Sequence, residues 1–120
     1  MKISNPIAVI GENFATKFLE NKGYKIIERN FRKGYGEIDI IAVFDNILIF
    51  VEVKTRTGKN FGTPLESITY SKLKTLTKTA EFYKLRNPRL PEQLRIDAVS
   101  VSLDHSGNLI EIEHVENISY

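Results

Sequence analysis

The sequence predicts an α/β domain in which a mixed β-sheet is flanked by helices. Two segments carry apolar residues at helical spacing, and five others are short runs rich in apolar and β-branched residues. These segments follow one another in the order α-β-β-β-α-β-β, which is typical of a sheet with helices packed on it. A chain of 120 residues fits one domain, which we assign to residues 1–120.

The first helix is expected over residues 6–21. Asn5 is a preferred N-cap and Pro6 a preferred first helical residue, while Gly23 is a suitable C-terminal stop. Between these signals, apolar residues recur at helical spacing at Ile7, Ile10, Phe14 and Phe18. Glu12 falls at the edge of this apolar face rather than at the centre of the solvent side.

Three strands should follow, over residues 24–31, 37–44 and 47–55, with a turn over residues 32–36. Asp45-Asn46 separates two apolar runs and is typical of a two-residue turn. The second and third strands should therefore form an antiparallel hairpin.

The second half of the chain should contain one helix and two strands. A loop over residues 57–64 precedes the helix, which Ser67 or Thr69 can cap and which should run to about Leu85. Strands are expected over residues 95–103 and 109–115, separated by a Ser-Gly-Asn turn.

Composition narrows the classes of function. The chain has no cysteine, which excludes disulfides and thiolate metal sites. The first residues lack the apolar core of a signal peptide, and the apolar run 47–51 is far too short to cross a bilayer. We therefore expect a cytoplasmic protein without a membrane partner.

Charge is unevenly distributed along the chain. The formal net charge is only +2, but residues 54–89 hold nine basic side chains against two acidic ones. Such a segment can attract a phosphate backbone, which makes nucleic acid a candidate partner. The alternative is a solvated helix face beside a basic loop.

Charged residues interrupt the two most apolar strands. A strand in the middle of a sheet covered by helices should be almost continuously apolar. Asp39 nevertheless stands in one of these strands, and Glu52 and Lys54 stand in the next. Glu52 and Lys54 share one face because side chains alternate along a strand. If the hairpin register brings Asp39 to the same side, two carboxylates and an ammonium group converge.

A hard divalent cation suits this group of side chains. Mg²⁺ binds oxygen ligands, usually one or two carboxylates with water and phosphate, so the candidate ligands are Asp39, Glu52 and the Val53 carbonyl. A bound metal polarises a phosphoryl oxygen and activates water. Lys54 would orient the water or stabilise the developing charge, and Glu12 is the candidate fourth catalytic member.

Other interpretations of these charges remain open. The three strand residues could form a structural ion network without catalysis, and Glu12 could be a solvated helix carboxylate. Glu37 shares a face with Asp39, but it lies at a strand start, where solvated charges are common. We interpret His105 and His114 as surface residues rather than as catalytic bases.

Two sequence blocks resemble the YraN-like family, also known as uncharacterised protein family 0102. They are Gly36-Glu37-Ile38-Asp39-Ile40-Ile41-Ala42 and Ile49-Phe50-Val51-Glu52-Val53-Lys54-Thr55-Arg56. Further blocks resemble the family at Gly11-Glu12, Gly23-Tyr24, Asn30-Phe31-Arg32, Phe61-Gly62 and Arg95-Ile96-Asp97-Ala98-Val99. The resemblance covers residues 11–101.

That family looks like a member of the restriction-endonuclease-like superfamily, whose signature is PD-(D/E)xK. The matching residues are Asp39, Glu52 and Lys54, with Glu12 as the upstream helical acid and Ile38 at the position of the proline. The arrangement is similar to that of archaeal Holliday-junction resolvases. The resemblance implies a restriction-endonuclease-like fold and hydrolysis of DNA phosphodiester bonds that depends on Mg²⁺ or Mn²⁺.

Three functions are therefore considered. The first is a metal-dependent DNA endonuclease acting on branched or damaged DNA, for which a homodimer would supply a second site to cut the second strand. The second is a non-catalytic nucleic-acid-binding or adaptor module with a vestigial nuclease site. The third is an interaction protein in which the charges only stabilise the fold. Candidate phosphate contacts, which flank the site in sequence, are Arg56, Lys59 and Lys72.

Overall fold

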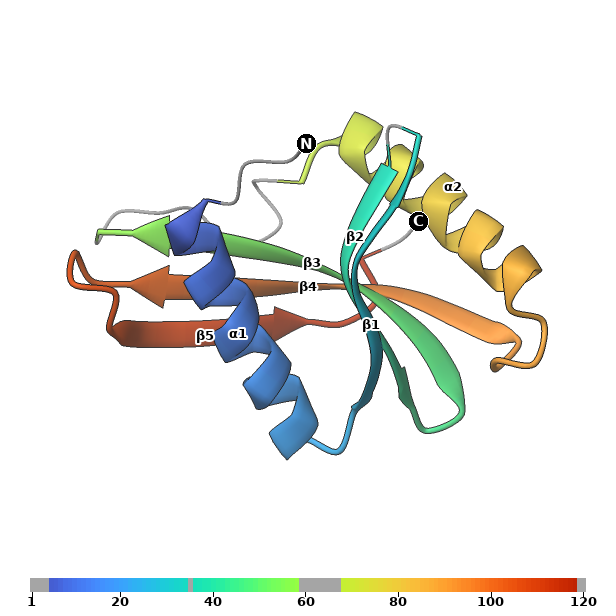
Figure 1. Ribbon diagram of the computed structural model, residues 1–120, viewed down its shortest axis with the longest axis horizontal. Coiled ribbons are helices and arrows are strands. Elements are labelled where there is room, and N and C mark those ends of the chain that lie inside the picture. The colour runs from blue at the N-terminus through green and yellow to red at the C-terminus, as the bar shows by residue number, and fades with distance from the viewer. Residues whose placement is uncertain (1–4, 35, 59–67, 119–120) are drawn as a thin grey trace.

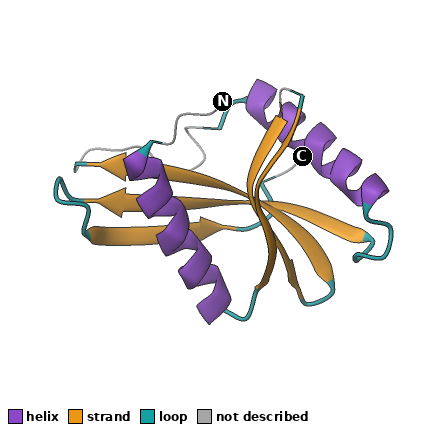
Figure 2. Cartoon of the chain, viewed as in Figure 1, coloured by secondary structure: helices purple, strands orange, loops and turns teal. Residues whose placement is uncertain are grey.

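A computed structural model describes residues 5–34, 36–58 and 68–118 of the chain. These ranges contain α1 (Pro6–Asn21), β1 (Lys25–Lys33), β2 (Gly36–Phe44), β3 (Ile47–Thr57), α2 (Tyr70–Arg86), β4 (Gln93–Leu103) and β5 (Leu109–Val115). The element order confirms the predicted α/β class with a mixed sheet and flanking helices (Figure 2).

The strands of the described ranges form one sheet in the order β1-β2-β3-β4-β5. Neighbours pair antiparallel except β3 and β4, which are parallel. A parallel pair needs a long crossover, and the segment that contains α2 provides it. The β1–β2 hairpin is steeply inclined to β3, β4 and β5, so the sheet is strongly twisted (Figure 1). The pairing between β2 and β3 ends at Ile40 and Val51.

The two helices pack against different hydrophobic clusters of the sheet. Ala15 and Leu19 of α1 belong to one cluster, while four residues of α2 belong to the other: Leu73, Leu76, Ala80 and Tyr83. Val51 of β3 packs with the α1 cluster, and its neighbour Phe50 packs with the α2 cluster. Because both faces are covered, the middle of β3 is almost continuously apolar.

Local signals explain where the helices begin and end. The side chain of Asn5 accepts a hydrogen bond from the Ile7 N–H at 2.9 Å, and Gly23 follows α1 with φ +96°. Thr69 caps α2 by accepting from the Lys72 N–H at 3.1 Å. Neither helix in the described ranges combines the length and the apolar content needed to cross a membrane.

The turn between β2 and β3 is the predicted two-residue turn. Asp45 and Asn46 both have positive φ, 52° and 60°, which matches the turn type that suits the twist of a hairpin. The register that follows pairs Phe44 with Ile47 and Ala42 with Ile49.

Four strands run past a predicted bound, and among them β2 begins one residue earlier and β4 two residues earlier than predicted. β1 runs to Lys33, through the first residues of the predicted turn, because Arg32 pairs with Glu37 across the hairpin. Their side chains also form an ion pair of 3.3 Å. β3 runs to Thr57 because its parallel pairing with β4 continues to that residue. Most of the predicted loop over 57–64 lies outside the described residues.

Candidate active site where two strands separate

The candidate site lies where β2 and β3 stop pairing. The last pair of the ladder is Ile40 with Val51, and the next pair would set Asp39 opposite Glu52. Instead, the Val53 N–H donates to Oδ2 of Asp39 at 2.7 Å, so a side-chain carboxylate replaces the main-chain acceptor of the ladder. Because the N–H and C=O of one residue point to the same side of a strand, the Val53 carbonyl also faces this opening.

Asp39 lies in surroundings that oppose its ionisation. Burial is the largest cause and the negative charge of Glu52 the next, and together they raise the pKa of Asp39 to about 8. A hydrogen bond with the Glu52 side chain and the charge of Glu12 act in the same direction, whereas the Val53 N–H lowers the pKa. Asp39 therefore holds a proton at neutral pH, and Glu52 lies close enough to share it.

Glu52 is buried, and its carboxylate forms ion pairs with two lysines. Its side chain is 5% exposed, and Oε2 lies 3.3 Å from Nζ of Lys72 and 3.9 Å from Nζ of Lys54. Lys54 comes from the same strand, while Lys72 comes from the first turn of α2. Both lysine side chains are more than one third exposed, so they can turn towards solvent or towards an anionic substrate.

Glu12 reaches the edge of the site from α1. Its Oε1 lies 3.8 Å from a guanidinium nitrogen of Arg29 on β1, and its charge contributes to the raised pKa of Asp39. The neighbouring Gly11 fixes this position, because a Cβ at Gly11 would overlap the side chain of Thr55 on β3. The absence of a side chain at this position lets α1 approach the sheet closely.

The other predicted residues are placed differently. Glu37 forms an ion pair with Arg32 across the β1–β2 hairpin. Arg56 lies two residues beyond Lys54 on β3, and Lys59 lies outside the described residues.

The available metal ligands are few. No group of three or more His, Asp or Glu side chains able to hold a metal occurs within the described residues. A cation at this opening would therefore be held by Asp39 and Glu52 with the Val53 carbonyl and water. This set of hard oxygen donors suits Mg²⁺, which usually binds one or two carboxylates and keeps several waters.

Sequence reasoning named Lys72 as a candidate phosphate contact, which stays a prediction, and it missed the ion pair of Lys72 with Glu52. The pair joins two residues that are twenty positions apart along the chain, and it depends on where α2 lies relative to β3. No local pattern indicates it. The ion pair between Glu12 and Arg29 was missed for the same reason.

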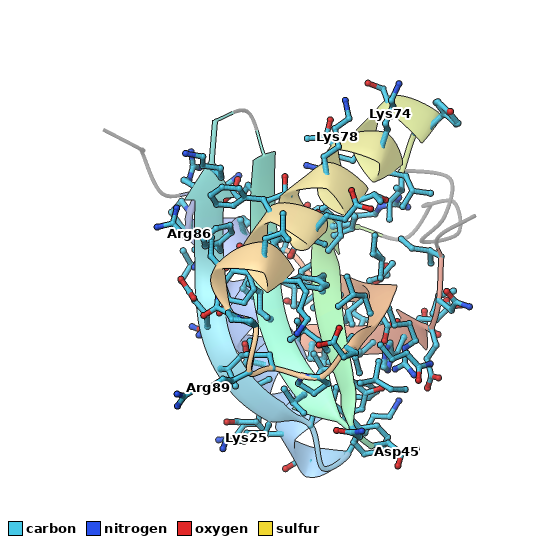
Figure 3. The ribbon with its side chains drawn as sticks, turned by 90° about the vertical axis from the view of Figure 1, so that its right-hand side faces the viewer. Lys25, Asp45, Lys74, Lys78, Arg86 and Arg89 are labelled. Carbon is cyan, nitrogen blue, oxygen red and sulfur yellow. The ribbon has the colours of Figure 1, made fainter. Side chains whose placement is uncertain are left out.

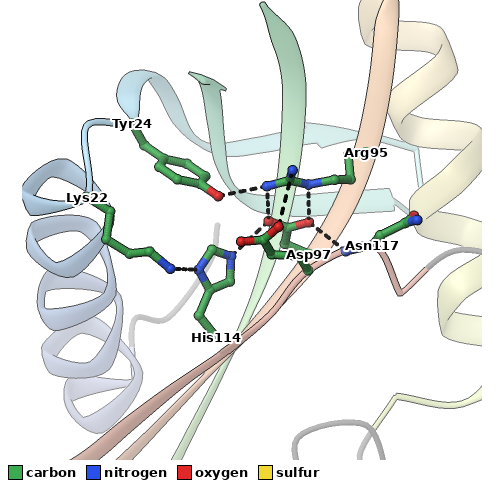
Figure 4. Close-up of polar contacts among 7 residues, drawn as sticks. Lys22, Tyr24, Arg95, Asp97, His114 and Asn117 are labelled. Carbon is green, nitrogen blue, oxygen red and sulfur yellow. Dashed lines mark hydrogen bonds and ion pairs between the residues drawn. The ribbon is translucent and has the colours of Figure 1, made fainter. Parts of the chain in front are cut away.

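A second polar cluster is centred on Asp97 of β4 (Figure 4). The fully buried Asp97 carboxylate accepts hydrogen bonds from Arg95, His114 and the Asn117 N–H, at 2.8 to 3.0 Å. Arg95 also donates to the hydroxyl of Tyr24 at 2.7 Å. The hydrogen bonds from His114 and Arg95 outweigh the effect of burial and lower the pKa of Asp97. This cluster ties β4 to β5 and to the segment after it.

The interpretation of His114 as a surface residue is wrong. Its side chain is only 2% exposed, and Nε2 lies 2.8 Å from Oδ2 of Asp97 while Nδ1 lies 2.7 Å from Nζ of Lys22. Because a lysine ammonium only donates, Nδ1 accepts and Nε2 carries the hydrogen. The alternating pattern of β5 did not reveal this burial, since it depends on the end of α1 covering the ring.

The fold and the site together define a class: an α/β protein with a mixed five-stranded sheet, two flanking helices and two carboxyl groups where strands separate. A model of Uncharacterised protein family UPF0102 matches residues 11–101. A UPF0102 protein of Dictyoglomus turgidum is 41% identical over 112 residues, covering 92% of this chain and 94% of that protein. A UPF0102 protein of Alkaliphilus oremlandii is 42% identical over 118 residues, covering 96% and 98%.

A third relative, a UPF0102 protein of Chloroherpeton thalassium, is 44% identical over 110 residues. The chain belongs to Uncharacterised protein family UPF0102, as the resemblance to the YraN-like family predicted. The matched range includes the whole opening, from Gly11 on α1 to β4.

Proposed function

We propose that this protein is a metal-dependent endonuclease that hydrolyses phosphodiester bonds of DNA, with branched or damaged DNA as its substrate class. The observation that carries the proposal is the pair formed by Asp39 and Glu52. Two carboxyl groups share one opening, and the pKa of one of them is raised to about 8 by burial and by the charge of the other. Such a pair is stabilised by a cation that neutralises both groups.

Mg²⁺ or Mn²⁺ would be held by Asp39, Glu52 and the Val53 carbonyl, and would polarise a phosphoryl oxygen and lower the pKa of a bound water. The Val53 N–H holds the Asp39 carboxylate in one orientation through its 2.7 Å hydrogen bond. Proton loss from Asp39 then supplies the second negative charge of the site. Glu12 adds negative potential from the edge of the opening.

The lysines provide the positive side of the site. Lys54 is 3.9 Å from the Glu52 carboxylate and is partly exposed, so its ammonium can approach a scissile phosphate and stabilise the charge that develops there. Lys72 forms an ion pair with Glu52 in the absence of substrate. When a metal cation neutralises Glu52 instead, the Lys72 ammonium can bind a neighbouring phosphate. Arg56 and Lys59 continue the basic sequence beyond Lys54 as further candidate phosphate contacts.

A cleavage assay tests the proposal. Four-way-junction, flapped and linear DNA are incubated with the protein and Mg²⁺ or Mn²⁺. Cleavage should be lost with EDTA and with Asp39→Asn or Glu52→Gln, and should fall about 100-fold or more with Lys54→Ala. Glu113→Gln removes an exposed acid on β5 and is the matched control, which should cut normally. Absence of cleavage by the wild type on all substrates, or undiminished cleavage by Asp39→Asn, contradicts the proposal.

The second candidate is a nucleic-acid-binding or adaptor module with a vestigial site. The ion pairs of Lys54 and Lys72 with Glu52 favour this second function, because the two lysines neutralise the Glu52 carboxylate without a metal. This function predicts salt-dependent DNA binding that persists with EDTA and in Glu52→Gln, without cleavage of any substrate. Binding that is lost on chelation rules it out.

A further inference from the structure

A row of side chains runs along α2 with a spacing of four residues. Residues four apart on a helix lie on one ridge of its surface. The row, called the basic ridge below, consists of Tyr70, Lys74, Lys78, Phe82 and Arg86. Figure 3 shows Lys74 and Lys78 projecting near one end of the helix and Arg86 near the other. The ridge therefore combines three basic groups with two aromatic rings over the length of α2.

The basic ridge is open to solvent. Tyr70 is 66% exposed, all three basic residues of the ridge are exposed, and Phe82 is partly buried. Glu81 is the one acidic residue of α2, and it lies beside the row rather than in it. An ordinary solvated helix face mixes charges of both signs. A ridge with two exposed or half-exposed rings and only positive charges differs from such a face.

Two cations lie near the ring of Phe82. Nζ of Lys33, on β1, lies 4.9 Å from the ring centroid, and the guanidinium carbon of Arg86 lies 5.7 Å from it. These residues line a hollow of about 290 Å³, and a second hollow of about 310 Å³ continues from Arg86 to Arg89. Arg32 also lines the first hollow, but Glu37 compensates its charge.

We propose that the basic ridge binds single-stranded nucleic acid. Proteins that hold single strands combine cations that follow the phosphates with aromatic rings on which bases stack. The ridge and the two hollows supply both, and a duplex offers no free base faces to Phe82 and Tyr70. For its role the inference rests on the proposed nuclease function, because the ridge would hold a single-stranded arm of branched DNA. Lys72 touches the site in the first turn of α2, and Arg86 lies about 21 Å further along the helix.

Binding without cleavage tests the charges of the ridge. The probe is a fluorescent oligothymidylate of about twenty nucleotides, titrated in EDTA and compared with a duplex of the same length. The double variant Lys78→Ala/Arg86→Ala should weaken single-strand binding about tenfold or more. It should also reduce the slope of log affinity against log salt by about 1.4, as expected for two lost phosphate contacts.

The matched control removes the same charge elsewhere. Lys17→Ala/Lys25→Ala changes two exposed lysines on α1 and β1 that neither belong to the ridge nor line its hollows, and should leave affinity within about twofold. An equal loss in both double variants means that net charge alone attracts the strand and overturns the proposal. Duplex binding as tight as single-strand binding overturns it as well, and so does tighter binding to vesicles of phosphatidylglycerol.

Phe82→Leu tests the aromatic ring. Leucine keeps apolar bulk against β1 but cannot stack with a base, so single-strand affinity should fall about fivefold or more while duplex affinity stays unchanged. Thermal unfolding of each variant checks that the fold is kept, and Phe82→Tyr should restore binding. Unchanged single-strand affinity in a folded Phe82→Leu protein rejects the stacking role. These titrations contain no metal, so they test single-strand binding independently of cleavage. Binding without cleavage would contradict only the proposed nuclease function, and cleavage without preferential single-strand binding would contradict only the role of the ridge.

Discussion

The carboxyl group of Asp39 is surrounded by groups that favour its protonated form. Its pKa is raised from 3.8 to about 8, first by burial and then by Glu52. Between these two pH values the folded protein holds a proton that the unfolded chain has released. The contribution of Asp39 to the free energy of unfolding therefore falls as pH rises between these two values.

We predict that this pH dependence disappears in Asp39→Asn, because asparagine does not titrate. Urea unfolding in EDTA, from about pH 5 to about pH 9, measures it. Wild type should lose stability relative to the variant as pH rises. Asp97 does not blur the comparison: its pKa is lowered, so its contribution is lost only at lower pH, and both proteins contain it. Parallel curves for the two proteins would contradict the raised pKa.

A substitution of Glu52 distinguishes a functional site from a structural ion network. We predict that Glu52→Gln changes the free energy of unfolding by no more than about 1 kcal/mol at pH 7. Lys54 and Lys72 are more than one third exposed and can turn to solvent, and the loss of the charge relieves Asp39. Chemical denaturation measures the change. A loss of about 3–5 kcal/mol, typical of a broken buried pair, would instead support charges that only stabilise the fold.

At the scale of elements, the contact of α1 with β3 positions Glu12. Alanine normally stabilises a helix interior by up to about 1 kcal/mol relative to glycine. We predict that Gly11→Ala nevertheless destabilises the protein by about 1–3 kcal/mol, because its Cβ would overlap the side chain of Thr55.

The measurement for Gly11 is a double-mutant cycle with Thr55→Ala. The second substitution removes the atoms nearest to the new Cβ, so the double variant should recover part of the lost stability. Additive effects, or a Gly11→Ala protein as stable as the wild type, would show that α1 is not held by this contact.

Elements with strong local signals were predictable from the sequence. The predicted bounds of the first helix, 6–21, agree with α1, because Asn5, Pro6 and Gly23 act locally. The Asp45-Asn46 turn was equally local. The ends of β1 and β3 were not predictable, since pairing with other strands extends them.

At the scale of the whole molecule, the site depends on how three layers meet. Strand alternation predicted that Glu52 and Lys54 share one face, but it left open whether the hairpin register brings Asp39 to that side. The observed ladder ends at Ile40 and Val51, one residue before Asp39 and Glu52. The sequence did not predict that the pairing of β2 with β3 ends there. The approach of Lys72 and the burial of His114 depend on packing between distant segments, which leaves no pattern in the local sequence.

The central claim is that Asp39 and Glu52 bind one divalent cation together. Crystals soaked in Mn²⁺ and measured at the manganese absorption edge test it most directly. We predict an anomalous peak at the opening between β2 and β3, within about 2.0–2.3 Å of oxygens of both carboxylates. Saturating Mn²⁺ that gives no peak there, with Lys72 still on Glu52, would contradict the account.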